Sequence, residues 1–388
     1  MNQSLDPPSS LIPGWATAEG TREYADKMQS LTGEGHFSEF LKSRIRLSSL
    51  GFGTFPGAPS IEEDENIGNL IAEAIAGGVN VIDTSAHYRY GHALAAVGQG
   101  IAKALNSGIS REALFIVSKG GFLTYRGGRP ENPDQWFEQE IVQQGLGNRD
   151  DLVNQVHLLS PEYIDYQIDL SRRITGLDTL DAFLIDQPEI HIPVIGKEAL
   201  NKKLLPVFEV LERAVSQNRI RCYGISTFEG FRVETDSPMF QSLTSMLGLA
   251  EKAAQSVSGQ AAKHHFAIAQ MPFNQAMSEG FTRFNHATGQ GNVASTLQAA
   301  YQLKVFMMGS HSMLKGQLAN QCADAVAQTL MVLANDAQRS LQFNRSTPGM
   351  GTSLVGIHSP SQLQDLLTVT RLPVMKRDQY LKLFQRTD

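Results

Sequence analysis

An acid and a phenol, Asp83 and Tyr88, follow a short apolar run at residues 79–82. Such a run is typical of a buried strand, which fixes a reactive group while the loop after it admits substrate. A phenol, with a pKa near 10, donates a proton poorly at neutral pH until a nearby ammonium stabilises its anion. Lys119 ends another apolar run, so we interpret Tyr88 as a proton donor, Lys119 as its activator and Asp83 as the group that orients Lys119. A merely structural Asp83–Lys119 ion pair is the alternative.

The rest of the chain predicts a repeating strand–helix pattern. The strands are short and apolar throughout, which is typical of a parallel sheet buried on both faces by helices. Strands are expected at 46–54, 79–83, 114–119, 179–185, 220–225, 265–270, 305–308 and 352–355. Helices are expected at 62–76, 93–105, 161–176, 197–217, 237–263, 293–302, 322–335 and 359–368.

Eight such repeats predict an α/β protein with a closed (β/α)8 TIM barrel. A dinucleotide-binding open sheet would require a G-x-G-x-x-G motif after the first strand, and the glycine pair at 51–53 continues differently. We expect residues 1–44 to form an N-terminal extension with short helices at 22–31 and 36–41, and residues 45–388 to form the barrel domain. The segment 122–151 is too long for a simple connector. Its first part, residues 122–136, is predicted to form part of a lid over the site or to pack against the N-terminal extension.

The composition of the chain indicates its compartment and the kind of partner that it binds. The chain of 388 residues carries a formal net charge of -6, which argues against a nucleic-acid groove or an anionic membrane surface as partner. No apolar run reaches the roughly 18 residues that span a bilayer. The N-terminus lacks the order of a signal peptide, and two cysteines are too few for a disulfide framework. We expect a reduced, cytoplasmic protein that acts on a small molecule, with no metal site and with an oligomeric state left open.

Several motifs along the chain together resemble the aldo-keto reductase family, from about Arg46 to Thr370. The matching segments are LGFGT at 50–54, DTS at 83–85 with Tyr88 and Arg89, VSK at 117–119, GIST at 224–227, Gln270, LQFNRSTPG at 341–349 and LVG at 354–356. The resemblance implies a nicotinamide-dependent carbonyl reductase with an Asp, Tyr, Lys and His tetrad. Asp83, Tyr88 and Lys119 match its first three members.

The fourth tetrad position departs from the family pattern. The segment that ends the fourth strand resembles the one in which the family carries His, but here the residue is Asp186. An ionised Asp186 would compete for Lys119, whereas a protonated one could donate a hydrogen bond to a substrate oxygen. His87 and His191 lie close in sequence and are possible substitutes.

The resemblance also implies a set of cofactor contacts. Ser226, Thr227 and Gln270 would meet the nicotinamide carboxamide, and the loop at 309–316 would wrap the pyrophosphate. The N-terminus of the last helix suits a phosphate. His358 is the candidate for a 2′-phosphate, so NADPH is expected, with NADH possible. The full predicted set is Thr54, Asp83, Ser226, Thr227, Gln270, Gly309, Ser310, His311, Ser312, Leu314, Gly316, Gly356, His358, Ser359, Gln362 and Asp365.

We therefore expect an oxidoreductase that reduces a carbonyl or related unsaturated group. Two alternatives remain open because Asp186 replaces the expected residue. One is a barrel that has lost hydride transfer and acts as a lyase or isomerase, with Asp186 and Tyr88 as acid and base. The other is a non-catalytic binding subunit.

Overall fold

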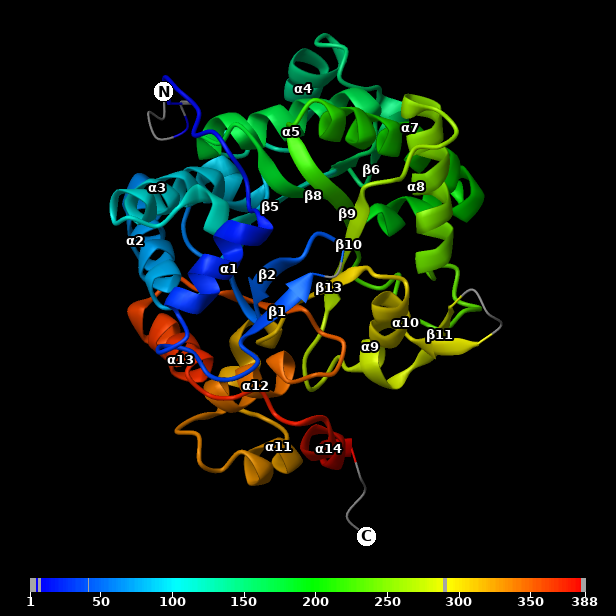
Figure 1. Ribbon diagram of the computed structural model, residues 1–388. Coiled ribbons are helices and arrows are strands. Elements are labelled where there is room, and N and C mark those ends of the chain that lie inside the picture. The colour runs from blue at the N-terminus through cyan, green and yellow to red at the C-terminus, as the bar shows by residue number, and fades with distance from the viewer. Residues whose placement is uncertain (1–4, 6–7, 41, 289–291, 385–388) are drawn as a thin grey trace.

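A closed barrel of eight parallel strands forms the centre of the computed structural model, which describes residues 5, 8–40, 42–288 and 292–384 (Figure 1). Strands that follow one another along the chain pair in the barrel, so the predicted (β/α)8 architecture is confirmed. The strands are β3 (Leu50–Gly53), β4 (Val81–Asp83), β5 (Phe115–Gly120), β8 (Leu180–Asp186), β9 (Ile220–Ser226), β10 (Phe266–Pro272), β13 (Phe306–Ser310) and β14 (Thr352–Gly356).

One principal helix follows each barrel strand and packs outside it. Serine side chains cap several of these helices, including Ser160, which accepts a hydrogen bond from the Tyr163 amide as the sequence suggested. The helices are α2 (Ile61–Ala76), α3 (His92–Asn106), α5 (Pro161–Thr175), α7 (Lys197–Ser216), α8 (Leu243–Ser258), α10 (Thr296–Gln302), α12 (Asp336–Arg345) and α13 (Pro360–Thr370).

The N-terminal segment closes the amino-terminal end of the barrel. Helix α1 (Ala18–Lys27) precedes an antiparallel hairpin of β1 (Phe37–Phe40) and β2 (Ile45–Ser48), drawn in blue in front of the barrel in Figure 1. Phe40 packs against Phe115 and Phe306, the first residues of β5 and β13, with ring centroids 6.5 and 5.1 Å away. Because the hairpin covers this end, substrate must approach the opposite, carboxyl end of the strands.

Five local predictions need correction. The expected helix at 36–41 is wrong, because pairing with β2 makes this segment the strand β1, and the predicted first strand at 46–54 divides into β2 and β3. The hairpin thus crosses the predicted boundary between residues 44 and 45. The helix expected at 237–263 is only α8, and the one expected at 293–302 begins as strand β12 (Val293–Ser295), which pairs with β11 (Phe284–Ala287). The helix expected at 322–335 is the short α11 (Asp324–Thr329), and α12 starts after it.

The long segment after β5 is partly ordered into short elements. It contains α4 (Pro133–Phe137), the π-helix η4 (Glu138–Val142), the 3₁₀ helix η5 (Arg149–Asp151) and the strand pair β6 (Leu152–Val153) and β7 (His157–Leu158). Its apolar side chains form a separate small core with Tyr163 of α5. The remaining short elements are η2 (Tyr88–Gly91), η3 (Arg111–Ala113), η6 (Pro188–His191), α6 (Ile192–Ile195), α9 (Glu279–Thr282), η7 (Leu314–Ala319), α14 (Arg377–Leu381) and η8 (Lys382–Phe384).

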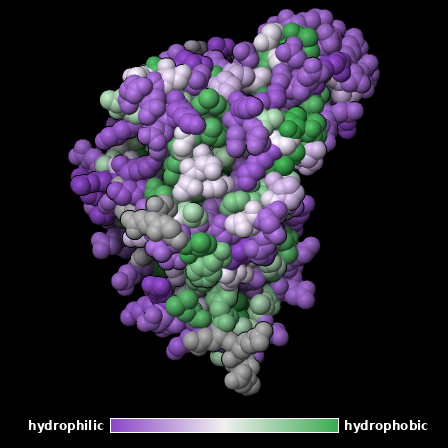
Figure 2. Space-filling view, turned by 90° about the vertical axis from the view of Figure 1, so that its right-hand side faces the viewer, coloured by the Kyte–Doolittle hydropathy of each residue, from purple (hydrophilic) through white to green (hydrophobic). Residues whose placement is uncertain are grey.

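The hairpin of β11 and β12 lies outside the barrel and leaves apolar side chains uncovered. Phe284, Val293 and Tyr301 of the adjacent α10 each expose more than half of their surface. The elements at the right of Figure 1 face the viewer in Figure 2, where green atoms gather in the lower half of the molecule. Among the described residues, none of the helices combines the length and apolar character needed to cross a bilayer.

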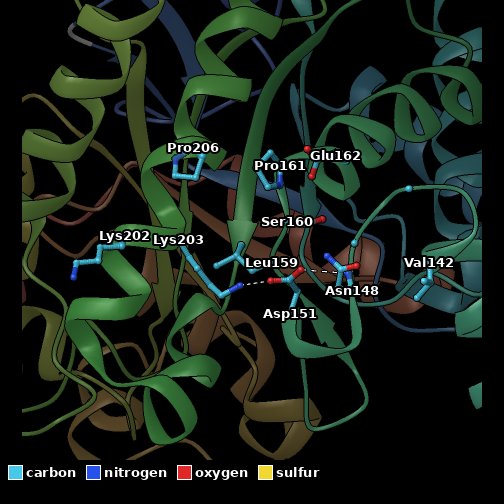
Figure 3. A pocket seen from close by; sticks show the side chains of 12 residues that line it. Val142, Asn148, Asp151, Leu159, Ser160, Pro161, Glu162, Lys202, Lys203 and Pro206 are labelled. Carbon is cyan, nitrogen blue, oxygen red and sulfur yellow. Dashed lines mark hydrogen bonds and ion pairs between the residues drawn. The ribbon is translucent and has the colours of Figure 1, made fainter.

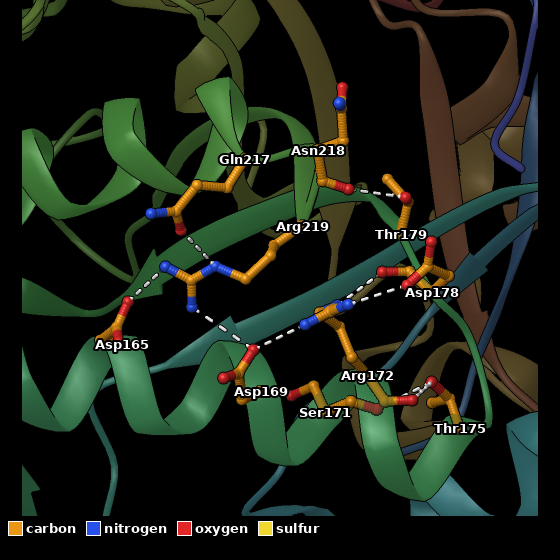
Figure 4. Close-up of polar contacts among 10 residues, drawn as sticks. All are labelled: Asp165, Asp169, Ser171, Arg172, Thr175, Asp178, Thr179, Gln217, Asn218 and Arg219. Carbon is orange, nitrogen blue, oxygen red and sulfur yellow. Dashed lines mark hydrogen bonds and ion pairs between the residues drawn. The ribbon is translucent and has the colours of Figure 1, made fainter. Parts of the chain in front are cut away.

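Ion pairs connect elements of the barrel both at its surface and in its interior. At the surface, Arg172 and Arg219 share Asp169, and Arg172 also donates to Asp178 at 3.1 Å (Figure 4). In the interior, the Asp181 carboxylate pairs with Arg111 at 2.7 Å and accepts hydrogen bonds from the Ala16 and Ile116 amides. Burial raises the pKa of Asp181, and Arg111 with the two amides opposes that rise. The buried pair therefore connects the N-terminal segment to β5 and β8.

We predict that Asp181→Asn destabilises the protein by about 3–5 kcal/mol, because it leaves the buried Arg111 guanidinium without a carboxylate. Asp178→Asn removes one member of an exposed pair and should cost about 1 kcal/mol or less. Urea unfolding followed by circular dichroism measures both. An equal loss in the free energy of unfolding in the two variants would contradict the explanation that the Asp181 pair is buried and the Asp178 pair exposed.

Candidate active site

The carboxyl end of the barrel holds a buried ion pair between Lys119 and Asp83. Lys119 is the last residue but one of β5 and Asp83 ends the neighbouring β4, so pairing of the two strands brings the side chains together. Lys119 Nζ donates to Asp83 Oδ1 at 2.5 Å and to the Thr84 carbonyl at 3.2 Å. The Lys119 side chain is fully buried. Burial lowers the pKa of Lys119, but Asp83, Tyr88 and Asp186 raise it above its ordinary value, so Lys119 is a cation at neutral pH.

Tyr88 lies directly beside this pair. Lys119 Nζ donates to the Tyr88 hydroxyl at 3.2 Å and lies 4.9 Å from the centre of its ring. Burial raises the pKa of Tyr88, and the Lys119 ammonium opposes that rise without cancelling it. Tyr88 is therefore protonated at neutral pH, and its proton lies next to a cation that would stabilise the phenolate.

Asp186 ends β8 and is buried at the same end of the barrel. Its backbone pairs with Ser226 at the end of β9. Burial raises the pKa of Asp186 to about 6, with Lys119 and a hydrogen bond from Ser226 opposing the rise and Asp83 adding to it. A carboxyl group with this pKa changes between its ionised and protonated forms close to neutral pH.

Polar side chains from β9 and β10 complete the inner ring. Gln270 Nε2 donates to Asp83 Oδ2 at 3.0 Å, and the Ser226 hydroxyl donates to Gln270 Oε1 at 3.1 Å. A serine hydroxyl has one proton, so Ser226 can serve either Gln270 or Asp186 at one time. The buried Thr227 Oγ1 has no hydrogen-bond partner among the described residues. These groups offer donors and acceptors that a carboxamide could satisfy.

The predicted pyrophosphate loop leaves the end of β13. Its backbone enters the left-handed region at His311, Leu314, Lys315 and Gly316. The loop is held by Asn274, which donates to the His311 carbonyl at 2.9 Å, and by the Ser312 hydroxyl, which donates to the Leu354 carbonyl at 2.5 Å. Gly309 and Ser310 pair with β10, so the loop starts beside Gln270.

The predicted adenosine end lies at the start of α13. Gly356 pairs with Gly53, and a Cβ there would lie 3.1 Å from Pro56, so a side chain at this position would require Pro56 to shift slightly. Ser359 caps the helix, and Gln362 accepts a hydrogen bond from the His358 amide. Asp365 already accepts hydrogen bonds from Asn335 and Gln338, whereas the His358 side chain is exposed. Thr54, at the end of β3, donates from its hydroxyl to the Asp83 carbonyl at 3.1 Å.

Three histidines line the interior next to this site, and one of them was not predicted from the sequence. His157, from the end of the long loop, makes a 2.7 Å hydrogen bond with the Asp186 carbonyl and a 2.9 Å bond with His191. Burial lowers the pKa of His87 and His157 to about 3 and that of His191 to about 4, so all three are neutral. No sequence signal identifies His157, because only the fold brings residue 157 to the end of β8.

Glu189 is a second residue whose place beside the site only the structure reveals. Its carboxylate accepts hydrogen bonds from the Phe228 and Glu229 amides at 2.5 and 3.1 Å. Burial raises the pKa of Glu189 to about 7, against the opposing effect of its backbone hydrogen bonds. Glu189 therefore titrates in the same range as Asp186.

A separate pocket of about 590 Å³ lies away from these residues (Figure 3). Its walls come from the end of the long loop, the N-terminus of α5 and the middle of α7. Lys203 forms an ion pair with Asp151 across it, as the dashed line shows. None of the predicted site residues lines this pocket.

Comparisons with known proteins agree with the barrel. Solved structures of similar fold include a thermostable aldo-keto reductase in complex with the inhibitor epalrestat (17% identity, TM-score 0.57, covering 89% of this chain and 98% of that one). Another is an aldo/keto reductase from Klebsiella pneumoniae in complex with NADP and acetate (16% identity, TM-score 0.55, covering 89% and 95%). A third is an aldo-keto reductase from Bacillus halodurans in its holo form (15% identity, TM-score 0.58, covering 89% and 95%). No curated protein sequence matches the chain.

The model of the aldo/keto reductase family matches residues 49–383, which include every barrel strand and every predicted site residue. The match spans far more than half of the chain, and the closed parallel barrel agrees with it. The chain therefore belongs to the aldo/keto reductase family of nicotinamide-dependent oxidoreductases.

Proposed function

We propose that this protein is an NADPH-dependent carbonyl reductase in which Tyr88 donates the proton. The observation that carries the proposal is the position of Lys119 Nζ, which contacts both Asp83 Oδ1 and the Tyr88 hydroxyl. Residues 45–388 would form the catalytic domain, and residues 1–44 an extension that covers the opposite end of the barrel. The substrate is a small molecule with a carbonyl or related unsaturated group.

The side chains have separate roles in this proposal. A reduced nicotinamide, when bound, supplies the hydride for the carbonyl carbon. Tyr88 transfers its proton to the carbonyl oxygen, and Lys119 stabilises the phenolate that remains. Asp83 holds Lys119 in place through one oxygen, and Gln270 donates to the other oxygen of Asp83, so the ammonium needs no reorganisation during the reaction.

Asp186 acts in its protonated form, as a hydrogen-bond donor to the same substrate oxygen. Lys119 already forms an ion pair with Asp83, so Asp186 does not have a cation to itself. Burial raises the pKa of Asp186 to about 6, with Lys119 opposing the rise and Asp83 adding to it, so the protonated form becomes populated as the pH falls towards 6. The alternative use of the same proton is a lyase or isomerase reaction, with Asp186 and Tyr88 as acid and base and no hydride.

The cofactor would lie across the ends of β9, β10, β13 and β14. Thr227 Oγ1 is buried without a partner, and Ser226 and Gln270 offer further polar groups for the nicotinamide carboxamide. The loop at 309–316 would hold the pyrophosphate, with His311 and Lys315 as sources of positive charge. The N-terminus of α13, capped by Ser359, and the exposed His358 would meet the adenosine phosphate.

The first prediction is that the purified protein binds reduced nicotinamide cofactor, and NADPH more tightly than NADH. Fluorescence titration with each cofactor measures the two dissociation constants. His358→Ala should weaken NADPH binding and leave NADH binding unchanged, because only NADPH carries the 2′-phosphate. If neither cofactor binds at millimolar concentration, the reductase proposal fails; tighter NADH binding overturns only the phosphate preference.

A second prediction concerns the proton donor. Tyr88→Phe removes one hydroxyl and keeps the ring, so folding and cofactor affinity should stay nearly unchanged. Turnover of the carbonyl substrate should fall by about 10²-fold or more, which is the range of general-acid catalysis. Steady-state kinetics and a cofactor titration on the same variant separate the two effects, and unchanged turnover would transfer the acid role to Asp186.

The third prediction is a pH dependence that originates at Asp186. A carboxyl with a pKa of about 6 gains its proton as the pH falls through 6, so kcat/KM should rise between pH 7.5 and pH 5.5. Asp186→Asn keeps a neutral donor, so it should retain activity, but its kcat/KM should no longer rise as the pH falls. Asp186→His restores the residue that the family pattern expects and should gain reduction of simple aldehydes.

Glu189 must be separated from Asp186 in this experiment because both carboxyls titrate near neutral pH. Glu189→Gln serves as the control, and its kcat/KM should still rise between pH 7.5 and pH 5.5. If Asp186→Asn binds cofactor but loses all activity, the carboxylate itself is required, and the lyase or isomerase function is favoured.

A further inference from the structure

The backbone directly after Tyr88 adopts a conformation that its residues disfavour. Arg89 has φ 49° and ψ 35°, Tyr90 has φ 58° and ψ 36°, and Gly91 has φ 93°. For residues other than glycine, this left-handed region costs free energy and persists only when surrounding contacts impose it. Contacts with the surrounding structure, and not the backbone preference of its own residues, therefore hold the turn that carries the proposed proton donor.

The Arg89 side chain provides the strongest of these contacts. It is almost completely buried, and Nη1 lies 3.1 Å from Oδ1 of the fully buried Asp64 on α2. The same Nη1 donates to the Ala58 carbonyl at 3.0 Å in the loop between β3 and α2. Asp64 is in turn held by His92 of α3, whose Nδ1 lies 2.6 Å from Asp64 Oδ2. Arg89 Nε and Nη2 have no hydrogen-bond partner among the described residues, so the contacts of Nη1 with Asp64 and with the Ala58 carbonyl hold the guanidinium.

Other contacts around the turn are weaker or reach only its edges. The Gly127 amide donates to the Tyr90 carbonyl at 2.9 Å, and the Tyr88 and Tyr90 amides donate within the turn. The Tyr88 ring has Phe55 at its edge with centroids 5.1 Å apart, but Phe55 is 64% exposed. Among the described residues of the turn, Arg89 is the one whose side chain forms an ion pair with α2, and His92, directly after the turn, contacts the same Asp64 carboxylate.

We propose that Arg89, held by Asp64, is a positioning residue that fixes Tyr88 against Lys119. Arg89 touches neither reacting group, so it acts through the backbone of the turn. This inference rests on the proposed role of Tyr88 and extends it, because it names the interaction that keeps the hydroxyl 3.2 Å from Lys119 Nζ.

Arg89 and Tyr90 have similar left-handed backbone conformations, so replacing each of them with glycine gives a matched pair of variants. Arg89→Gly relieves the backbone strain and removes the anchor, and Asp64 keeps His92 as partner. Tyr90→Gly relieves the same strain and leaves the anchor in place. If strain alone mattered, both variants would behave alike. If the anchor matters, kcat falls only in Arg89→Gly, by about tenfold or more, since small misplacements of a catalytic group have large effects on rate.

Hydrogen exchange gives a readout that does not depend on turnover. The amides of the turn, in a peptide covering residues 84–94, should exchange at least about ten times faster in Arg89→Gly than in the wild type or Tyr90→Gly. Cofactor affinity should be unchanged in both variants. Arg89→Lys keeps a cation and should recover part of kcat. If Arg89→Gly folds poorly, the double variant Arg89→Gly with Asp64→Asn, which removes the buried carboxylate together with its cation, should fold better and still show the fall in kcat.

The outcomes separate the two proposals. Faster exchange with unchanged kcat, or a fall in kcat that Tyr90→Gly shares, overturns the positioning role. Unchanged exchange in Arg89→Gly overturns the anchor itself. A wild-type protein that binds cofactor and reduces no carbonyl refutes the proposed function, and the exchange experiment then still tests whether Arg89 holds the turn.

Discussion

The buried ion pair between Lys119 and Asp83 is the interaction on which the rest of the site depends. Removing two charges from water is costly unless they meet in good geometry and their remaining hydrogen-bonding positions are filled. Here the strand pairing of β4 and β5 sets the geometry, and Gln270 and the Thr84 carbonyl fill the remaining positions. The pair is therefore stable in the interior, and its ammonium is in contact with the Tyr88 hydroxyl.

The same pair explains the unusual chemistry expected of Asp186. The interior holds a second carboxyl close to one cation that Asp83 already neutralises, and the three neighbouring histidines are neutral. Without a cation of its own, a buried carboxyl favours its protonated form. A carboxyl at residue 186, where the family resemblance implies an imidazole, has a hydrogen-bonding character that depends on pH near neutrality. Glu189, with its raised pKa, adds a second such group three residues later.

The elements around the site are held by contacts between distant parts of the chain. The end of the long loop returns to β5, where the Leu158 amide donates to the Gly121 carbonyl, and its His157 reaches the end of β8. Gly121 must lack a side chain here, since a Cβ would lie 2.4 Å from His157 Nε2. Leu5 of the N-terminal segment packs against Ala86, just before Tyr88, and its carbonyl accepts a hydrogen bond from Arg126. The turn that carries Tyr88 is thus enclosed by segments that lie far from it in sequence.

The sequence by itself determined the barrel, the family and the order of the candidate residues. Apolar strands that end in Asp83, Lys119 and Asp186 are local patterns, and a parallel barrel places all such ends on one face. It did not determine β1, β12 or the start of α12, because strand pairing and packing outside the segment decide those. Nor could it identify the contact of His157 with the end of β8, the buried contact of Arg89 with Asp64 or the surroundings that raise the pKa of Asp186. Burial and through-space charge set those properties, and neither exists until distant segments have packed together.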